Sequence, residues 1–177
     1  MNLPNKLSIL RVLCIPVIVV LLYMGDDTCR LAAAGVFVLG ALTDLLDGKI
    51  ARKYNLITDF GKFIDPVADK LLVLTTLVML VRGGLMEAWV LVLILCRELA
   101  VDGLRMVAVG QGKVIAAGPW GKWKTTFQMV TVTVILLTNQ PCFGVWYTAV
   151  LTCVSVALTV WSAVDYFVKN RSVFSAE

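Results

Sequence analysis

The sequence predicts an all-α, polytopic membrane protein with six transmembrane helices and a short juxtamembrane segment at its amino terminus. Of its 177 residues, 59% are hydrophobic and 16% are charged, whereas a soluble domain has roughly 45–50% apolar and ~25% charged residues. The mean hydropathy is +0.87. At ~20 residues per helix, six spans use roughly 120 residues. We therefore expect one integral-membrane domain over residues 1–177 and no separate soluble domain.

The first three apolar segments are expected as helices over residues 7–24, 31–53 and 62–81. The first is followed by Gly25-Asp26-Asp27 rather than by a small-residue cleavage site, which favours a retained span over a removed signal peptide. The second ends in a basic stretch that reaches Lys53, and the third is followed by the turn signal Gly83-Gly84.

The last three apolar segments are expected as helices over residues 86–109, 123–138 and 145–168. Gly110, Gly112 and Gly118-Pro119 separate the first two of these, and Asn139-Gln140-Pro141 precedes the last. In lipid, only helices and closed barrels satisfy the backbone, and these segments lack the alternation of barrel strands. A soluble helical bundle, the alternative, would need polar outer faces that most of these segments lack.

Basic residues predict the orientation in the membrane. If the amino terminus is cytoplasmic, the cytoplasmic ends and loops contain Lys6, Arg11, Lys49, Arg52, Lys53, Lys62, Lys113, Lys122, Lys124, Lys169 and Arg171. The opposite loops contain only Arg30 and Arg82. Because Lys and Arg concentrate in cytoplasmic loops, we expect a multi-pass protein of the cell (inner) membrane with both termini in the cytoplasm.

Two absences narrow the chemistry. The chain has no His, which excludes His-ligated metals and His general bases. Its 5 Cys residues form no C-x-x-C pair, so neither a zinc framework nor a redox motif is indicated. No nucleic-acid partner is expected.

Acidic residues at the predicted cytoplasmic ends of the second and third segments carry the strongest functional signal. Asp44 and Asp47 are three residues apart, and Asp65 and Asp69 are four apart, so each pair shares one helix face. The short connecting loop makes the two helices antiparallel neighbours, so their acidic faces can converge. Like charges this close raise one another's pKa unless something positive lies among them. Oxygen ligands without nitrogen or sulfur favour Mg²⁺, Mn²⁺ or Ca²⁺; the alternative is four solvated carboxylates.

Small and basic residues beside these carboxylates suit a phosphate or diphosphate substrate. Gly48 and Gly61 leave room for a ligand to approach the backbone. Arg52 and Lys53 add positive charge next to the acidic residues. A metal that bridges phosphate oxygens, with bases that neutralise developing charge, is the usual arrangement for such substrates.

Together these residues form a pattern with fixed spacing. Its positions are Asp44, Asp47, Gly48, Ala51, Arg52, Gly61, Asp65 and Asp69. The pattern resembles the signature of the CDP-alcohol phosphatidyltransferase family, without departure. The resemblance implies a polytopic helical fold and a membrane-embedded enzyme whose site opens to the cytoplasm.

The resemblance also implies a role for each signature residue. The four Asp residues would bind Mg²⁺ or Mn²⁺, usually two ions, and Asp69 would also take the proton from the acceptor hydroxyl. The residues expected to bind the CDP-lipid are Gly48, Ala51, Arg52 and Gly61. The lipid tails would lie in the membrane against apolar helix faces.

Shorter patterns further along resemble the branch of the family that makes phosphatidylglycerophosphate. They are Arg97-Glu98-Leu99, Leu104-Arg105 and Gly121-Lys122-Trp123-Lys124-Thr125. The implied reaction transfers the phosphatidyl group of CDP-diacylglycerol to glycerol 3-phosphate and releases CMP.

The acceptor phosphate is expected to bind basic side chains of the fourth and fifth segments. Arg97 and Arg105 are eight residues apart, about 80° around a helix, so both can face one pocket with Lys122 and Lys124. Guanidinium and ammonium groups suit a phosphorylated alcohol. Alternatively, the two Lys residues anchor the membrane surface, and the two Arg residues form an ion-pair network with Glu98 and Asp102. Asp165 is expected to be structural.

Other functions stay open at this stage. A related enzyme could use another acceptor, such as an inositol phosphate or a phospholipid. A small cation transporter also contains intramembrane carboxylates, but the carboxylates here cluster at one edge rather than near the midplane. A membrane scaffold would show no metal dependence. The expected partners are the two substrates, membrane lipid and a second copy of the chain in a homodimer.

Overall fold

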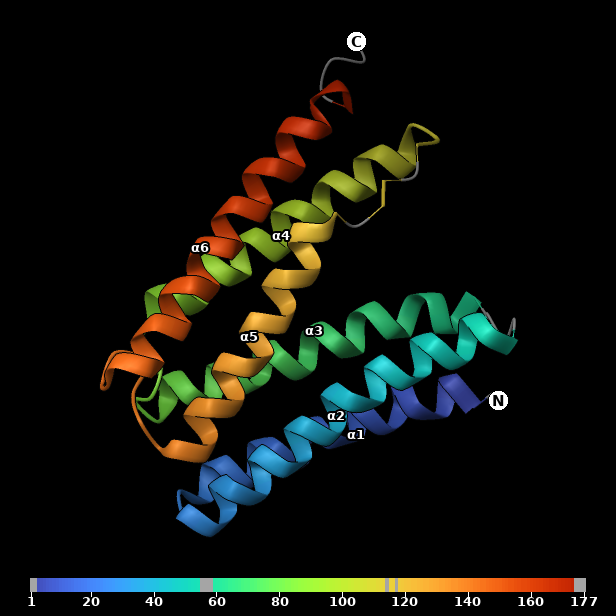
Figure 1. The fold of residues 1–177 in the computed structure, drawn as a ribbon. Coiled ribbons are helices and arrows are strands. Elements are labelled where there is room, and N and C mark those ends of the chain that lie inside the picture. Colours follow the sequence, from blue (N-terminus) through green and yellow to red (C-terminus); the bar gives the residue numbers. More distant parts are fainter. Residues whose placement is uncertain (1–2, 55–58, 114, 117, 174–177) are drawn as a thin grey trace. The chain divides into compact units, whose positions relative to one another are not determined.

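The computed structural model confirms the all-helical prediction. It describes residues 3–54, 59–113, 115–116 and 118–173, with backbone alone for residues 3–6, 44–54, 59–63, 65 and 172. The six α-helices of this part of the chain are α1 (Leu3–Met24), α2 (Asp27–Tyr54), α3 (Asp59–Arg82), α4 (Ala88–Gly110), α5 (Pro119–Thr138) and α6 (Trp146–Lys169) (Figure 1). A short 3₁₀ helix, η1 (Arg171–Val173), follows α6.

The helix boundaries lie close to the predicted ones, and the differences have local causes. The juxtamembrane segment expected before the first span is continuous with α1, which begins at Leu3. Helix α5 begins at Pro119 rather than at Trp123, because proline at a first helical position has no N–H to leave unbonded and a preset φ. Gly25 and Asn139 follow α1 and α5 with φ of 81° and 54°, the left-handed conformation that commonly ends a helix.

The chain divides into two compact units, each of which is described by itself. The first unit comprises residues 1–86 and 132–140, with α1, α2, α3 and the last turns of α5. The second comprises residues 87–131 and 141–177, with α4, the first turns of α5, α6 and η1. A single domain over residues 1–177 stays a prediction.

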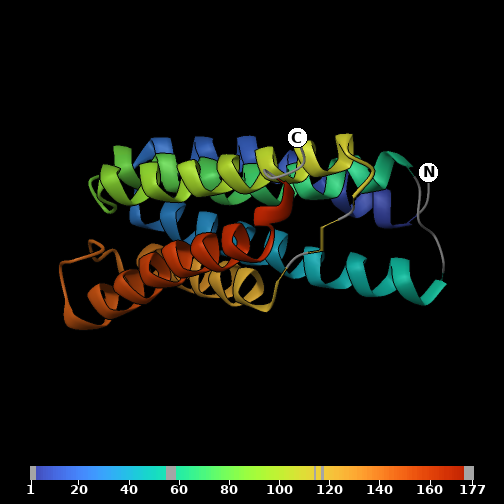
Figure 2. The ribbon, with the colours of Figure 1, turned by 90° about the horizontal axis from the view of Figure 1, so that it is seen from above.

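In the first unit, α1 packs against both α2 and α3, and α2 also contacts α3 (Figures 1 and 2). Small residues allow the close approach, since Ala33 and Ala34 of α2 and Ala68 of α3 are fully buried. At Gly40, a Cβ atom would lie only 2.9 Å from Cδ2 of Leu72. Gly40 therefore marks a position at which α2 and α3 approach each other closely.

Replacing Gly40 by Ala is expected to destabilise the first unit. The added methyl group would overlap the buried Leu72 side chain, and overpacking of a core typically costs about 1–3 kcal/mol. Thermal unfolding in detergent should show a lower Tm for Gly40→Ala. Gly35→Ala is the matched control on α2, because its Cβ would meet nothing within 4 Å. Equal Tm values for the two variants would contradict the close approach.

Arg30 and Arg82, the basic residues predicted for the outer loops, both have defined partners in the first unit. The guanidinium of Arg30 donates to the carbonyl oxygen of Leu136 and, through Nη2, to Oδ1 of Asp27 at 2.9 Å. This contact joins the first turn of α2 to the end of α5. The Arg82 guanidinium carbon lies 4.1 Å from the centre of the Tyr23 ring, which joins the end of α3 to the end of α1.

In the second unit, α4 and α6 lie side by side (Figures 1 and 2). The buried face of α6 consists mainly of small hydroxyl residues; its members are Thr148, Thr152, Ser155, Thr159, Ser162 and Tyr166. Two hydroxyl groups on this face donate to carbonyl oxygens of α6 itself: Thr159 Oγ1 to Ser155 at 2.7 Å and Ser162 Oγ to Thr159 at 3.1 Å. Small hydroxyl side chains let helices approach closely inside a membrane protein.

By length and composition, two helical segments of the described chain could cross a membrane: Leu7–Met24 in α1 and Trp146–Lys169 in α6. The six predicted spans are thus confirmed as helices but not, by this criterion, as six membrane crossings. Ionisable residues explain the case of α4, where Arg97, Glu98, Asp102 and Arg105 interrupt the apolar sequence.

Candidate active site

The acidic residues of the sequence pattern lie on the two helices predicted for them. Asp44 and Asp47 are on α2, and Asp65 and Asp69 are on α3, which contact each other in the first unit. The side chain of Asp69 is half-buried. The side chains of the other three Asp residues lie outside the described residues.

The register between α2 and α3 follows from the close approach of Gly40 to Leu72. The acidic positions lie four and seven residues after Gly40 on α2, and three and seven residues before Leu72 on α3. In antiparallel helices with a rise of about 1.5 Å per residue, Asp44 is therefore level with Asp69 to within about one residue. By the same count, Asp47 is level with Asp65. At ~100° per residue, all these positions fall within ~60° of the Gly40–Leu72 direction.

The remaining predicted residues near the acidic positions lie outside the described side chains. They are Gly48, Ala51, Arg52 and Gly61. Among the residues that the structure describes, no group of three or more His, Cys, Asp or Glu could hold a metal ion. The predicted ligand set therefore stays a prediction. Its donor chemistry suits Mg²⁺ or Mn²⁺, because every proposed ligand atom is a carboxylate oxygen.

Arg11 is a buried cation on α1 that the sequence indicated only as a cytoplasmic positive charge. Its side chain is fully buried, with 0% relative exposure. The contact between Tyr23 and Arg82 fixes the register of α1 against α3. Arg11 lies twelve residues before Tyr23, and Lys70 lies twelve residues before Arg82. Since both helices run in the same direction, Arg11 lies at about the level of Asp69. The sequence did not predict that the Arg11 side chain is buried, because an Arg near the end of a predicted span usually faces solvent.

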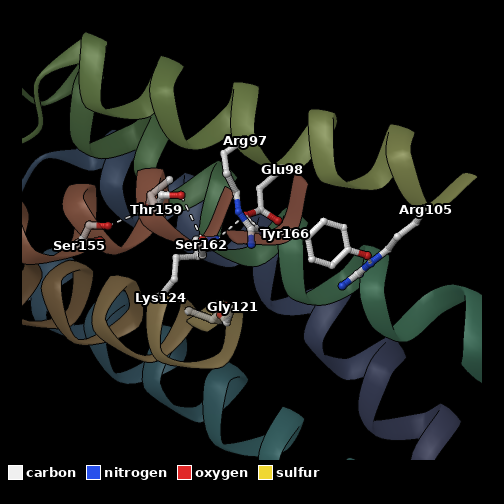
Figure 3. Close-up of polar contacts among 10 residues, drawn as sticks. Arg97, Glu98, Arg105, Gly121, Lys124, Ser155, Thr159, Ser162 and Tyr166 are labelled. Carbon is white, nitrogen blue, oxygen red and sulfur yellow. Dashed lines mark hydrogen bonds and ion pairs between the residues drawn. The ribbon is translucent and has the colours of Figure 1, made fainter. Parts of the chain in front are cut away.

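In the second unit, Glu98 brings together two of the four basic residues predicted to bind the acceptor phosphate (Figure 3). Nη1 of Arg97 donates to Oε1 of Glu98 at 3.1 Å, and Nζ of Lys124 donates to the same oxygen. Lys124 is buried, with 3% relative exposure. Lys124 is therefore not the exposed membrane anchor that was its alternative, whereas the ion-pair alternative for Arg97 is present with Glu98.

Arg105 is held by a residue that the sequence did not indicate. Nε of Arg105 donates to the hydroxyl oxygen of Tyr166 at 2.9 Å (Figure 3), and the guanidinium carbon lies 5.4 Å from the ring centre. Tyr166 is buried on α6. The signal that could have found it is the alternation of four- and three-residue steps from Thr148 to Tyr166, which marks one helix face.

The other two predicted features of this region are separate from the buried cluster. Lys122 is exposed and makes no ion pair with the described part of the chain. Both interpretations of Lys122, binding of the acceptor phosphate and anchoring at the membrane surface, therefore stay open. Asp165 forms an ion pair with Lys169 at 2.7 Å, one turn along α6. This contact agrees with the structural role expected for Asp165.

The fold and these positions define a class of protein: an all-helical chain with acidic pairs on two adjacent antiparallel helices. The family model described as CDP-alcohol phosphatidyltransferase matches residues 1–161. The chain belongs to the CDP-alcohol phosphatidyltransferase family, as the resemblance of the sequence pattern implied.

Curated relatives align over nearly the whole chain. A CDP-diacylglycerol–glycerol-3-phosphate 3-phosphatidyltransferase of Bacillus subtilis (strain 168) is 42% identical, with 96% of this chain and 95% of that protein aligned. The protein of the same name from Rickettsia typhi is 37% identical over 98% of this chain and 99% of its own length. A probable phosphatidylglycerophosphate synthase of Mycobacterium tuberculosis (strain H37Rv) is 39% identical over 93% of this chain and 79% of its own length.

Proposed function

We propose that this protein is an enzyme that transfers the phosphatidyl group of CDP-diacylglycerol to glycerol 3-phosphate, giving phosphatidylglycerophosphate and CMP. The observation that supports this most directly is the near-full-length similarity to relatives that carry this activity in their names. The complete acidic pattern on α2 and α3 agrees with it. The reaction belongs to anionic phospholipid biosynthesis.

Each Asp of the pattern has a proposed part in this reaction. Asp44, Asp47, Asp65 and Asp69 are proposed to hold two Mg²⁺ or Mn²⁺ ions, and the level register of α2 and α3 supports a shared site. Bound metal would polarise phosphate oxygens and make the acceptor hydroxyl more acidic. Asp69 accepts the hydroxyl proton, so that the acceptor oxygen can attack the phosphorus next to diacylglycerol.

Different residues are proposed to bind the two substrates. Gly48, Ala51 and Gly61 leave space for the CDP group, and Arg52 contacts a phosphate. The residues proposed to bind the phosphate of glycerol 3-phosphate are Arg97, Arg105, Lys122 and Lys124. Burial of Lys124 supports a role beyond membrane anchoring, since a buried charge is costly unless it is paired. Arg11, buried at about the level of Asp69, would offset repulsion among the carboxylates.

The membrane arrangement is proposed from apolar surface and charge. We propose that all six helices cross the cell membrane, with both termini and the active site in the cytoplasm. Large apolar side chains stay exposed along the helices, including Leu13 and Val20 on α1 at 59% each and Trp146 on α6 at 79%. Surfaces of this kind mark contact with lipid or with another chain. They are also compatible with the proposed homodimer, which native mass spectrometry from lipid nanodiscs would test.

A direct assay tests the function. Purified protein, radiolabelled glycerol 3-phosphate and CDP-diacylglycerol should give a labelled lipid and CMP when Mg²⁺ is present. Without CDP-diacylglycerol no labelled lipid should form. If an inositol phosphate or a phospholipid replaces glycerol 3-phosphate with higher kcat/KM, the acceptor assignment is wrong. Cation flux without lipid synthesis would instead indicate a transporter.

A labelling experiment tests the orientation. In a variant without native cysteines, Asn55→Cys is expected to react with a membrane-impermeant thiol reagent only after cells are opened, because the basic residues place the connection between α2 and α3 in the cytoplasm. Restoring Cys29 alone provides the control, since it is the neighbour of Arg30, which is predicted to lie on the outer side. Reaction of Asn55→Cys in intact cells would overturn the topology.

A further inference from the structure

Two cations of the second unit, the partly buried Arg97 and the buried Lys124, share one carboxylate oxygen. Arg97 of α4 and Lys124 of α5 both donate to Oε1 of Glu98, which is on α4 (Figure 3). The Glu98 side chain is 11% exposed, and the Lys124 side chain is 4% exposed. The contact therefore links two helices through charges that are largely removed from water.

The electrostatics make Glu98 necessary for this arrangement. Two cations so close repel each other, and a buried charge is costly unless it is paired. The carboxylate of Glu98 offsets both effects. Among these three side chains, one negative charge stands against two positive charges, and the positive charge in excess would attract a phosphate.

Arg97 also keeps donors that Glu98 does not use. A guanidinium has five N–H donors in a planar fork, and the described contact with Glu98 occupies Nη1. Nε of Arg97 is buried without a partner in the described part of the chain. Nη2 lies 3.6 Å from the position that a Cβ on Gly121 would take (Figure 3). The absence of a side chain at Gly121 thus leaves space beside the guanidinium at the first turn of α5.

We propose that Glu98 is a positioning residue for the acceptor substrate: it fixes Arg97 and Lys124 in the arrangement in which they bind the phosphate of glycerol 3-phosphate. This inference rests on the proposed function. The sequence allowed two interpretations of these residues, an ion-pair network or a phosphate site. In this inference both hold, because the ion pairs position the side chains that bind the phosphate.

The test compares Glu98→Gln with the parent enzyme. Gln keeps the size and one acceptor oxygen but removes the charge, so the two cations lose their common partner. The KM for glycerol 3-phosphate is expected to rise about tenfold, which corresponds to ~1.4 kcal/mol. The kcat and the KM for CDP-diacylglycerol should change little. Inorganic phosphate, which competes for the same cations, should inhibit the variant less than it inhibits the parent.

Two further variants separate positioning from packing. Asp165→Asn is the matched control, because it removes a carboxylate of the same unit that pairs with the exposed Lys169; its KM for glycerol 3-phosphate should equal that of the parent. Glu98→Asp keeps the charge on a shorter side chain and should restore part of the affinity. If Glu98→Gln does not fold, the KM-against-kcat split of Glu98→Asp decides the question.

The outcomes are distinct. A uniform fall in kcat with both KM values raised alike would show a purely structural role and overturn the inference. A lower KM for glycerol 3-phosphate in Glu98→Gln would show that Glu98 opposes phosphate binding and would overturn it as well. A parent enzyme that consumes no glycerol 3-phosphate contradicts the proposed function itself, and the inference then fails with it.

Discussion

Asp69→Asn is expected to lower kcat at least ~100-fold, because general-base catalysis contributes typically 10²–10⁴-fold. Asn keeps the size of Asp but cannot accept the acceptor's proton. The KM for CDP-diacylglycerol should change less than in Asp44→Asn, since the proposed role of Asp44 is confined to metal binding. Initial rates at varied concentrations of both substrates and of Mg²⁺ measure these effects. Asp44→Asn should raise the Mg²⁺ concentration required for half-maximal activity more than Asp69→Asn does.

The control for this prediction is Asp26→Asn, which changes an exposed carboxylate between α1 and α2. It should retain the parent kcat. Asp47→Asn and Asp65→Asn should lower kcat to a similar extent, and EDTA should stop the parent enzyme until Mg²⁺ or Mn²⁺ is restored. Full activity in the chelator would refute a metal-dependent site at these four residues.

The helices were predictable from the sequence because membrane-like segments carry a strong and redundant signal. The length of each apolar segment predicted a helix, and Gly or Asn residues predicted where the helices end. Gly25 and Asn139 take the left-handed backbone conformation that is typical of such helix ends. The start of α5 was placed too late, at Trp123, because Lys122 and Trp120-Gly121 dilute the apolar signal there. Hydropathy is insensitive to a helix start that proline determines.

The acidic positions were predictable because their spacing expresses a helix period and their chemistry is unusual for an apolar chain. The contacts of the basic residues were not. Spacing put Arg97 and Arg105 on one side of α4, but it could not show that Glu98 shares an oxygen between Arg97 and Lys124. Such a contact depends on how α4 and α5 pack, which local sequence does not contain. Burial of Arg11 was missed for the same reason.

Arg105→Ala is expected to raise the KM for glycerol 3-phosphate at least ~10-fold, since a hydrogen bond to a charged group contributes roughly 1.5–3 kcal/mol and each ~1.4 kcal/mol is a factor of ten. The apparent affinity for CDP-diacylglycerol should change little. Arg105→Lys should recover only part of the loss, because an ammonium cannot reproduce the planar fork of a guanidinium. Tyr166→Phe, which removes the hydroxyl that orients Nε of Arg105, should have a smaller effect in the same direction.

Steady-state kinetics with three acceptors complete the test of Arg105. Glycerol lacks the phosphate and should be a poor acceptor for the parent enzyme, and Arg105→Ala should narrow the difference between glycerol and glycerol 3-phosphate. Lys113→Ala removes an exposed cation that follows α4 and should leave both KM values unchanged, which separates a specific contact from a general loss of positive charge. If glycerol or inositol reacts with the parent as fast as glycerol 3-phosphate does, Arg105 does not select a phosphate, and the acceptor of this enzyme is a different alcohol.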